Sequence, residues 1–239
     1  MNTKKIDKRG VKLDAHRGLS GLETENTMCA FVAAGNRESY YGIETDVHAT
    51  ADGKYVISHD GNLSRVYGAD VTIAGTPYAE LRKIRKTEED GDTAEFMAVP
   101  SLREYFTVCR RYGKVSVLEL KVEYTEKQLE EIVAIAKETD QAENIVYISF
   151  FLKNLILLRK MLPGATLQYL TGEITPQIIS DCVTYRLDID VVFTALTEET
   201  VAELKRNGVA INCWTVDDPA DAEKLIALGV NYITTNILE

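Results

Sequence analysis

Residues 209–235 read VAINCWTVDDPADAEKLIALGVNYITT, and this stretch decides the fold. It begins and ends with short apolar runs, Val209–Trp214 and Tyr232–Thr235, which are typical of buried strands. Between the two runs, Asp218 stands before Pro219, a pair that predicts the first residues of a helix. A strand, a helix and a second strand in this order form a βαβ unit, so the sequence predicts a parallel sheet.

The same alternation continues from this unit back to the N-terminus. Helix starts of the capping-box type occur at Ser101-Leu-Arg-Glu104 and Thr125-Glu-Lys-Gln128. Eight strands alternating with helices suit a closed barrel, and 239 residues is a typical length for one. We therefore predict an α/β fold with a single TIM (β/α)8 barrel domain over residues 1–239. The predicted strands are Val11–Ala15, Gly42–His48, Val115–Leu120, Ile145–Phe150, Thr166–Leu170, Asp190–Thr194, Val209–Trp214 and Tyr232–Thr235.

The alternation breaks between residues 61 and 98. Asp52-Gly53 predicts a hairpin turn just before this stretch, which is charged and contains one short predicted helix near 76–86. We interpret 61–98 as an insertion after the second strand. The chain also ends soon after its last predicted strand, which leaves no length for a full eighth helix. We expect the N-terminal segment or the insertion to cover that flank of the barrel.

Composition and charge restrict the partners. The chain has 37 acidic and 27 basic residues and a net charge of −10, which disfavours nucleic acid and anionic lipid surfaces as partners. No segment resembles a signal peptide or a membrane span of about 20 residues, so we expect a cytoplasmic protein without membrane insertion. The oligomeric state, including a homo-oligomer, stays open. The four cysteines form no C-x-x-C pair, so we expect reduced packing residues.

Three carboxylates are predicted to converge. Glu44 and Asp46 lie two residues apart on one strand, so both side chains point to the same face. Glu119 lies near the end of the next predicted strand. Facing the barrel axis, these anions would repel one another unless a cation lay between them. Carboxylate oxygens suit a hard ion, so the cofactor we expect is Mg2+ or Ca2+.

Two histidines and two cations accompany these carboxylates. His16 lies just after the first predicted strand, and His59 follows the second, beyond the predicted hairpin turn; both are expected at the end of the barrel where active sites form. Arg17 and Lys121 would create a local cationic pocket that suits a phosphate group in an acidic protein. Each motif alone is more often a surface feature. Their joint placement at the ends of three strands favours an active site.

A series of short motifs, each present once, extends along nearly the whole chain. They are Ala15-His-Arg-Gly18, Glu25-Asn-Thr27 with Ala30-Phe31, Ile43-Glu-Thr-Asp-Val47, Thr50-Ala-Asp-Gly53, His59-Asp60, Pro100-Ser-Leu102, Leu118-Glu-Leu-Lys121, Ser149-Phe150 and Trp214-Thr-Val216. In order and spacing this set resembles the glycerophosphodiester phosphodiesterases, whose barrel is of the phospholipase C-like type. The resemblance implies that the insertion is characteristic of the family and forms a cap near the pocket.

The resemblance also implies roles for individual residues. It implies a metal site formed by Glu44, Asp46 and Glu119, and acid-base catalysis by His16 and His59. It further implies phosphate binding by Arg17 and Lys121 and a substrate pocket walled by Trp214 and Phe150. The implied reaction is hydrolysis of a small glycerophosphodiester to sn-glycerol 3-phosphate and an alcohol. Which histidine is the acid, and whether water or a substrate hydroxyl attacks, stays open.

Three positions depart from the expected family pattern. Thr24 stands where the family usually has proline, Asp217 stands where asparagine is common, and Asn236 stands where aspartate is frequent. These departures leave the preferred alcohol of the substrate open. His48 shares the face of Glu44 and Asp46, but the family does not require a histidine there. Two alternatives to the implied reaction are kept: a lysophospholipase D-type or other phosphodiesterase, and a protein that binds phosphodiesters without cleaving them.

Overall fold

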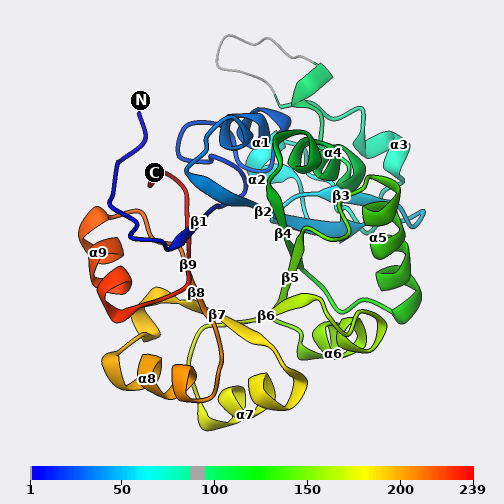
Figure 1. The fold of residues 1–239 in the computed structure, drawn as a ribbon. Coiled ribbons are helices and arrows are strands. Elements are labelled where there is room, and N and C mark those ends of the chain that lie inside the picture. The colour runs from blue at the N-terminus through cyan, green and yellow to red at the C-terminus, as the bar shows by residue number, and fades with distance from the viewer. Residues whose placement is uncertain (1, 87–94) are drawn as a thin grey trace.

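The computed structural model describes residues 2–86 and 95–239 (Figure 1). In this part of the chain eight parallel strands form a closed barrel, because β1 pairs with both β2 and β9. The predicted barrel is therefore confirmed. A ninth strand, β3, runs antiparallel to β2 at its end. The strands are β1 (Lys12–Ala15), β2 (Tyr40–Ala49), β3 (Tyr55–Ile57), β4 (Val115–Leu120), β5 (Ile145–Ser149), β6 (Thr166–Thr171), β7 (Asp188–Val192), β8 (Ile211–Trp214) and β9 (Tyr232–Thr235).

Helices surround the barrel, as Figure 1 shows. The predicted capping boxes are present at Ser101 and Thr125, where each side chain accepts a hydrogen bond from the third residue of its helix. Asp218 likewise caps the helix that begins at Pro219. The α-helices are α1 (Met28–Gly35), α2 (Ser64–Tyr67), α3 (Tyr78–Leu81), α4 (Leu102–Tyr112), α5 (Glu126–Glu138), α6 (Leu152–Met161), α7 (Pro176–Tyr185), α8 (Glu198–Arg206) and α9 (Pro219–Leu228).

Six of the eight predicted strands differ from the structure by one or two residues at one or both ends, and β4 and β9 agree. The predicted strand Asp190–Thr194 is β7, which begins at Asp188 and ends at Val192. It ends early because Phe193–Ala195 form a turn of 3-10 helix. β3 was not predicted as a strand, although its hairpin turn was. At three residues it is too short to show a hydrophobic period.

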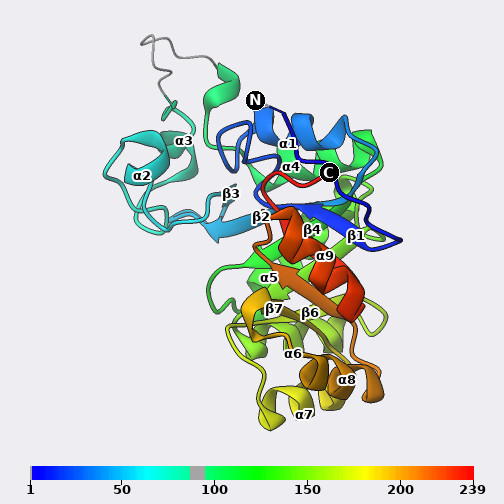
Figure 2. The ribbon, with the colours of Figure 1, turned by 90° about the vertical axis from the view of Figure 1, so that its left-hand side faces the viewer.

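Between β3 and α4 the chain leaves the barrel, and we call residues 55–86 and 95–101 the excursion. Figure 2 shows α2 and α3 of the excursion standing out from one side of the barrel. The predicted insertion, 61–98, falls here, and its residues 87–94 lie outside the described part. A small apolar cluster, separate from the main core, packs inside the excursion. Its buried members are Val56, Leu63, Tyr67, Ile73, Leu81 and Val99.

The flank without an eighth helix is covered by the N-terminal segment, one of the two candidates (Figure 1). Lys4 pairs with Leu238 as a parallel bridge, and the Ile6 amide donates to the Glu239 carbonyl at 2.9 Å. In the described residues no helix is long and apolar enough to cross a membrane.

Candidate active site

Glu44, Asp46 and Glu119 come together inside the barrel. Glu44 and Asp46 project from β2, and Glu119 lies opposite Asp46 in the register of β2 with β4. One carboxylate oxygen of each lies within 4.8 Å of the others, and all three side chains are buried. The convergence predicted from the two-residue spacing is therefore present.

The electrostatics of this triad call for a cation. Burial, with repulsion from Asp46, raises the pKa of Glu44 well above its usual value and that of Glu119 to about 7. Burial also opposes ionisation of Asp46, but Lys121 and Arg17 outweigh it and lower that pKa. Asp46 Oδ1 accepts no hydrogen bond from any described residue and lies 3.3 Å from Lys121 Nζ. A buried set of carboxylate oxygens, one of which accepts no hydrogen bond from any described residue, fits a hard divalent ion.

Neighbouring groups hold the triad in place. Asn26 Nδ2 donates to Asp46 Oδ2 at 2.7 Å, and Asn26 Oδ1 accepts from Thr45 Oγ1 at 2.7 Å. The Arg17 amide donates to Glu44 Oε2 at 2.8 Å. Both Asn26 and Arg17 have left-handed backbone conformations, with φ of 54° and 55°. Sequence reasoning assigned no role to Asn26, although it noted the motif that contains it.

The two histidines have different partners. His16 Nδ1 lies 2.8 Å from Asn236 Oδ1, and its Nε2 lies 3.9 Å from Glu44 Oε2. Burial, followed by the charge of Arg17, lowers the pKa of His16. His59 Nδ1 lies 2.7 Å from Asp60 Oδ1. Sequence reasoning found both histidines but neither partner. The Asp60 contact could have been inferred from its adjacency to His59, whereas Asn236 is 220 positions from His16.

Arg17 and Lys121 lie beside the triad. Arg17 Nη1 donates to Glu25 Oε1 at 2.9 Å, and its Nε lies 3.7 Å from Asp46 Oδ2. Lys121 Nζ lies 2.9 Å from Glu119 Oε1. The turn at Arg17 needs the next residue to be glycine: Gly18 has φ of 78°, and a Cβ there would lie 2.6 Å from the Ala30 carbonyl carbon.

A cavity of about 250 Å³ joins these groups. Phe150 and Trp214 form one wall, with ring centroids 6.0 Å apart and an interplanar angle of 83°. Asp190, which was not predicted, also lines the cavity. His48 is not among the lining residues that the structure describes, and its Nε2 lies 3.3 Å from the His59 carbonyl. Eight of the nine predicted site residues line the cavity: His16, Arg17, Glu44, His59, Glu119, Lys121, Phe150 and Trp214. The ninth, Asp46, completes the triad.

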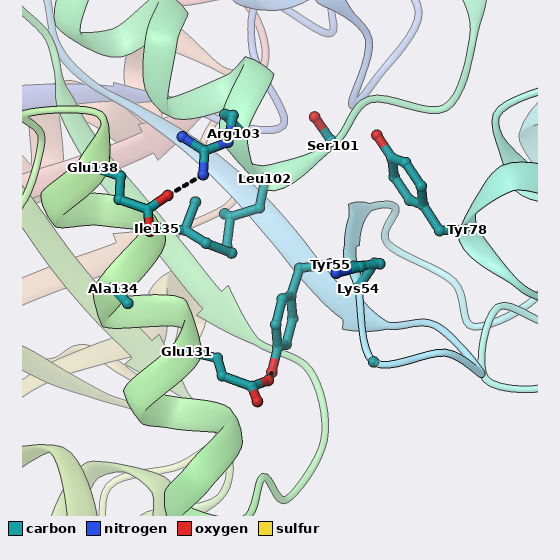
Figure 3. A pocket seen from close by; sticks show the side chains of 11 residues that line it. Lys54, Tyr55, Tyr78, Ser101, Leu102, Arg103, Glu131, Ala134, Ile135 and Glu138 are labelled. Atoms are coloured by element: carbon teal, nitrogen blue, oxygen red, sulfur yellow. Dashed lines mark hydrogen bonds and ion pairs between the residues drawn. The ribbon is translucent and has the colours of Figure 1, made fainter.

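A larger depression, about 520 Å³, lies elsewhere, between the start of β3 and helices α4 and α5 (Figure 3). The described residues that line it include no predicted site residue. Four of its polar side chains pair with one another: Tyr55 donates to Glu131 at 2.8 Å, and Arg103 pairs with Glu138. The chemistry therefore gathers in the smaller cavity.

Comparison with known proteins gives concordant results. Residues 16–239 match the model of the glycerophosphoryl diester phosphodiesterase family. A Bacillus altitudinis protein named glycerophosphodiester phosphodiesterase is 29% identical, over 95% of this chain and 94% of that one. A Thermotoga maritima structure of the same name is 26% identical, with a TM-score of 0.74 over 95% and 94% of the two chains. An Oleispira antarctica phosphodiesterase, solved with the product sn-glycerol-3-phosphate, is 24% identical, with a TM-score of 0.81 over 98% and 96%.

Proposed function

Since the chain belongs to the glycerophosphoryl diester phosphodiesterase family, we propose that it hydrolyses small glycerophosphodiesters to sn-glycerol 3-phosphate and an alcohol. One observation carries this proposal: a buried carboxylate triad, two histidines and two cationic side chains surround a single cavity. The product named with the Oleispira antarctica neighbour agrees with it.

The triad would hold the metal. Glu44, Asp46 and Glu119 offer only carboxylate oxygens, so we propose Mg2+ or Ca2+ as the ion. When bound, the ion would neutralise charge on the phosphodiester and help to activate a nucleophile. Arg17 and Lys121, which lie beside the triad, would extend the positive charge to the remaining phosphate oxygens.

The hydrogen bonds of His16 fix its tautomer. Asn236 donates from Nδ2 to Asp217 Oδ2 at 2.6 Å, so its carbonyl oxygen is the atom that faces His16. His16 Nδ1 must then carry the proton, which leaves Nε2 for the reaction. Asp60 accepts from His59 Nδ1 in the same way. One Nε2 would remove a proton from the nucleophile while the other protonates the departing alkoxide.

The aromatic wall suggests how the alcohol is held. Trp214 and Phe150 would pack against the non-phosphate part of the substrate. Phe150 and Phe151 are also exposed at the end of β5, with 45% and 38% of their surface accessible. These exposed rings favour one alternative, a lysophospholipase D-type activity on diesters that keep one acyl chain.

The test measures the choline or ethanolamine that is released with sn-glycerol 3-phosphate from glycerophosphocholine and glycerophosphoethanolamine. A third substrate is lysophosphatidylcholine, from which the same cleavage releases choline and lysophosphatidic acid. Protein treated with a chelator is assayed alone and after addition of Mg2+ or Ca2+. We expect metal-dependent release from the two small diesters. Faster cleavage of the lysophospholipid would favour the alternative, and no release from any substrate by folded protein would refute both.

A further inference from the structure

Arg65 contacts the surroundings of the active site from outside the barrel. It lies on α2, which belongs to the excursion and not to the barrel. Its Nε donates to Asp60 Oδ2 at 2.5 Å. Its Nη1 and Nη2 donate to the two carboxylate oxygens of Glu25 at 2.9 and 2.7 Å. One planar guanidinium thus holds two acids that come from different loops.

Each of these acids has its second partner inside the site. Asp60 uses its other oxygen, Oδ1, to accept from His59 Nδ1 at 2.7 Å. Glu25 Oε1 accepts from Arg17 Nη1 at 2.9 Å. His59 and Arg17 both line the cavity. A continuous series of hydrogen bonds therefore runs from His59 through Asp60, Arg65 and Glu25 to Arg17, and we call it the Arg65 bridge.

We propose that Arg65 is a positioning residue for the reaction: through Asp60 it orients His59, and through Glu25 it orients Arg17. The proposal rests on the proposed function. Glu25 and Asp60 would otherwise be free to change rotamer, because the guanidinium fork fixes both carboxylates at once. Without Arg65 the two anions would also lack their shared cation. Glu25 could then draw Arg17 away from the phosphate.

A second arginine of the excursion, Arg82, also binds a carboxylate but has no contact among the described residues that leads to the cavity. Arg82 follows α3 and donates two hydrogen bonds to Glu104 of α4, at 2.8 and 2.7 Å. Glu104 takes part in the capping box with Ser101, and among the described residues neither Arg82 nor Glu104 lines the cavity. The side chain of Arg82 is 27% exposed and that of Arg65 is 49% exposed. Arg82 therefore attaches the excursion to the barrel and provides a matched control.

The kinetic test compares Arg65→Gln, Arg65→Lys and Arg82→Gln with the wild type on glycerophosphocholine at saturating metal. We expect Arg65→Gln to lower kcat by about 10- to 100-fold, the size of loss that follows removal of the groups that orient metal-binding histidines and carboxylates, and to raise KM. Arg65→Lys keeps the positive charge but loses the forked guanidinium, so its kcat should lie between that of Arg65→Gln and that of the wild type. Arg82→Gln should stay within about twofold of the wild type. Equal kcat in the Arg65→Gln and Arg82→Gln variants would overturn the proposal.

The path through Asp60 is tested by the double variant Asp60→Asn/Arg65→Gln. If Arg65 acts on His59 through Asp60, the loss of kcat in the double variant should be smaller than the product of the losses in Asp60→Asn and Arg65→Gln, because the two changes share this path and only the path through Glu25 adds to the loss. Losses that multiply would show an independent role and contradict the proposal.

A readout without turnover separates this proposal from the proposed function. Nitrogen-15 NMR of the histidine rings should show the Nδ1–H tautomer of His59 in the wild type and in Arg82→Gln, and its loss in Arg65→Gln. A wild type that releases no sn-glycerol 3-phosphate would refute the proposed function, whereas the ring signals would still test the bridge. An unchanged His59 signal in folded Arg65→Gln protein would refute the orienting role of Arg65.

Discussion

Replacing Asp14 by asparagine should change how the stability of the barrel depends on pH. Asp14 lies on β1 with 1% of its surface exposed, and its Oδ1 accepts no hydrogen bond from any described residue. Burial raises its pKa from 3.8 to about 7, although Lys12 and a hydrogen bond from the Gly42 amide oppose the shift. The folded protein therefore keeps a proton on Asp14 that the unfolded chain loses near pH 4.

The sign and size of the effect follow from this difference. A carboxyl whose pKa is raised by folding contributes stability below the unfolded pKa, and that contribution is lost as pH rises to the folded pKa. Between pH 5 and pH 7 the loss is about 1.7 pH units rather than two, because folded Asp14 is half ionised at pH 7, and this is about 2.3 kcal/mol at about 1.36 kcal/mol per unit. Asparagine carries no such proton. The stability of Asp14→Asn relative to the wild type should therefore increase by about that amount over this interval.

The assay is urea unfolding followed by far-UV circular dichroism at pH 5, 6, 7 and 8. The quantity of interest is the difference in free energy of unfolding between variant and wild type, because every other titrating group is common to both. Asp7→Asn is the control, since this side chain is 79% exposed and stays in water in both states. A difference for Asp14→Asn that does not vary with pH would refute the reasoning.

Three further predictions concern the active site. His16→Ala and His59→Ala should each lower turnover by at least about 100-fold without changing the circular dichroism spectrum, and near-normal turnover in either would contradict its acid-base role. Mg2+ or Ca2+ at 100 times its Kd should raise the free energy of unfolding by about 2.7 kcal/mol and so raise Tm; an unchanged Tm with both ions would argue against a site at the triad. Gly18→Ala should lower both Tm and turnover, because its Cβ would lie 2.6 Å from the Ala30 carbonyl carbon. Wild-type values for both would show that this turn can relax.

The barrel and the gathering of the site residues were predictable because they depend on local patterns. Period-two alternation places Glu44 and Asp46 on one face, and the ends of parallel strands meet at one end of a barrel. The strand carrying Glu119 was recognisable from its apolar run. These local patterns therefore predict that the three carboxylates lie close together.

The partners of the site residues were not predictable in the same way. Asn236 reaches His16 across 220 positions, and the strand alternation only places both near one end of the barrel without pairing them. The sequence showed Asn236 only as a departure from the family pattern. Arg65 belongs to the excursion, where no hydrophobic period fixes the direction of a side chain. Its contact with Glu25, 40 positions away, depends on how two irregular loops fold against each other.

The separate apolar cluster of the excursion has a consequence for heat inactivation. A segment with its own small core can open as a cooperative unit while the rest of the protein stays folded. His59 and Arg65 both lie in the excursion, so such an opening would remove the proposed acid-base group and its proposed positioning contacts in one event. Enzyme activity should therefore disappear at a lower temperature than the barrel's secondary structure, and amide hydrogens around Leu63 and Leu81 should exchange before those of β4 and β5.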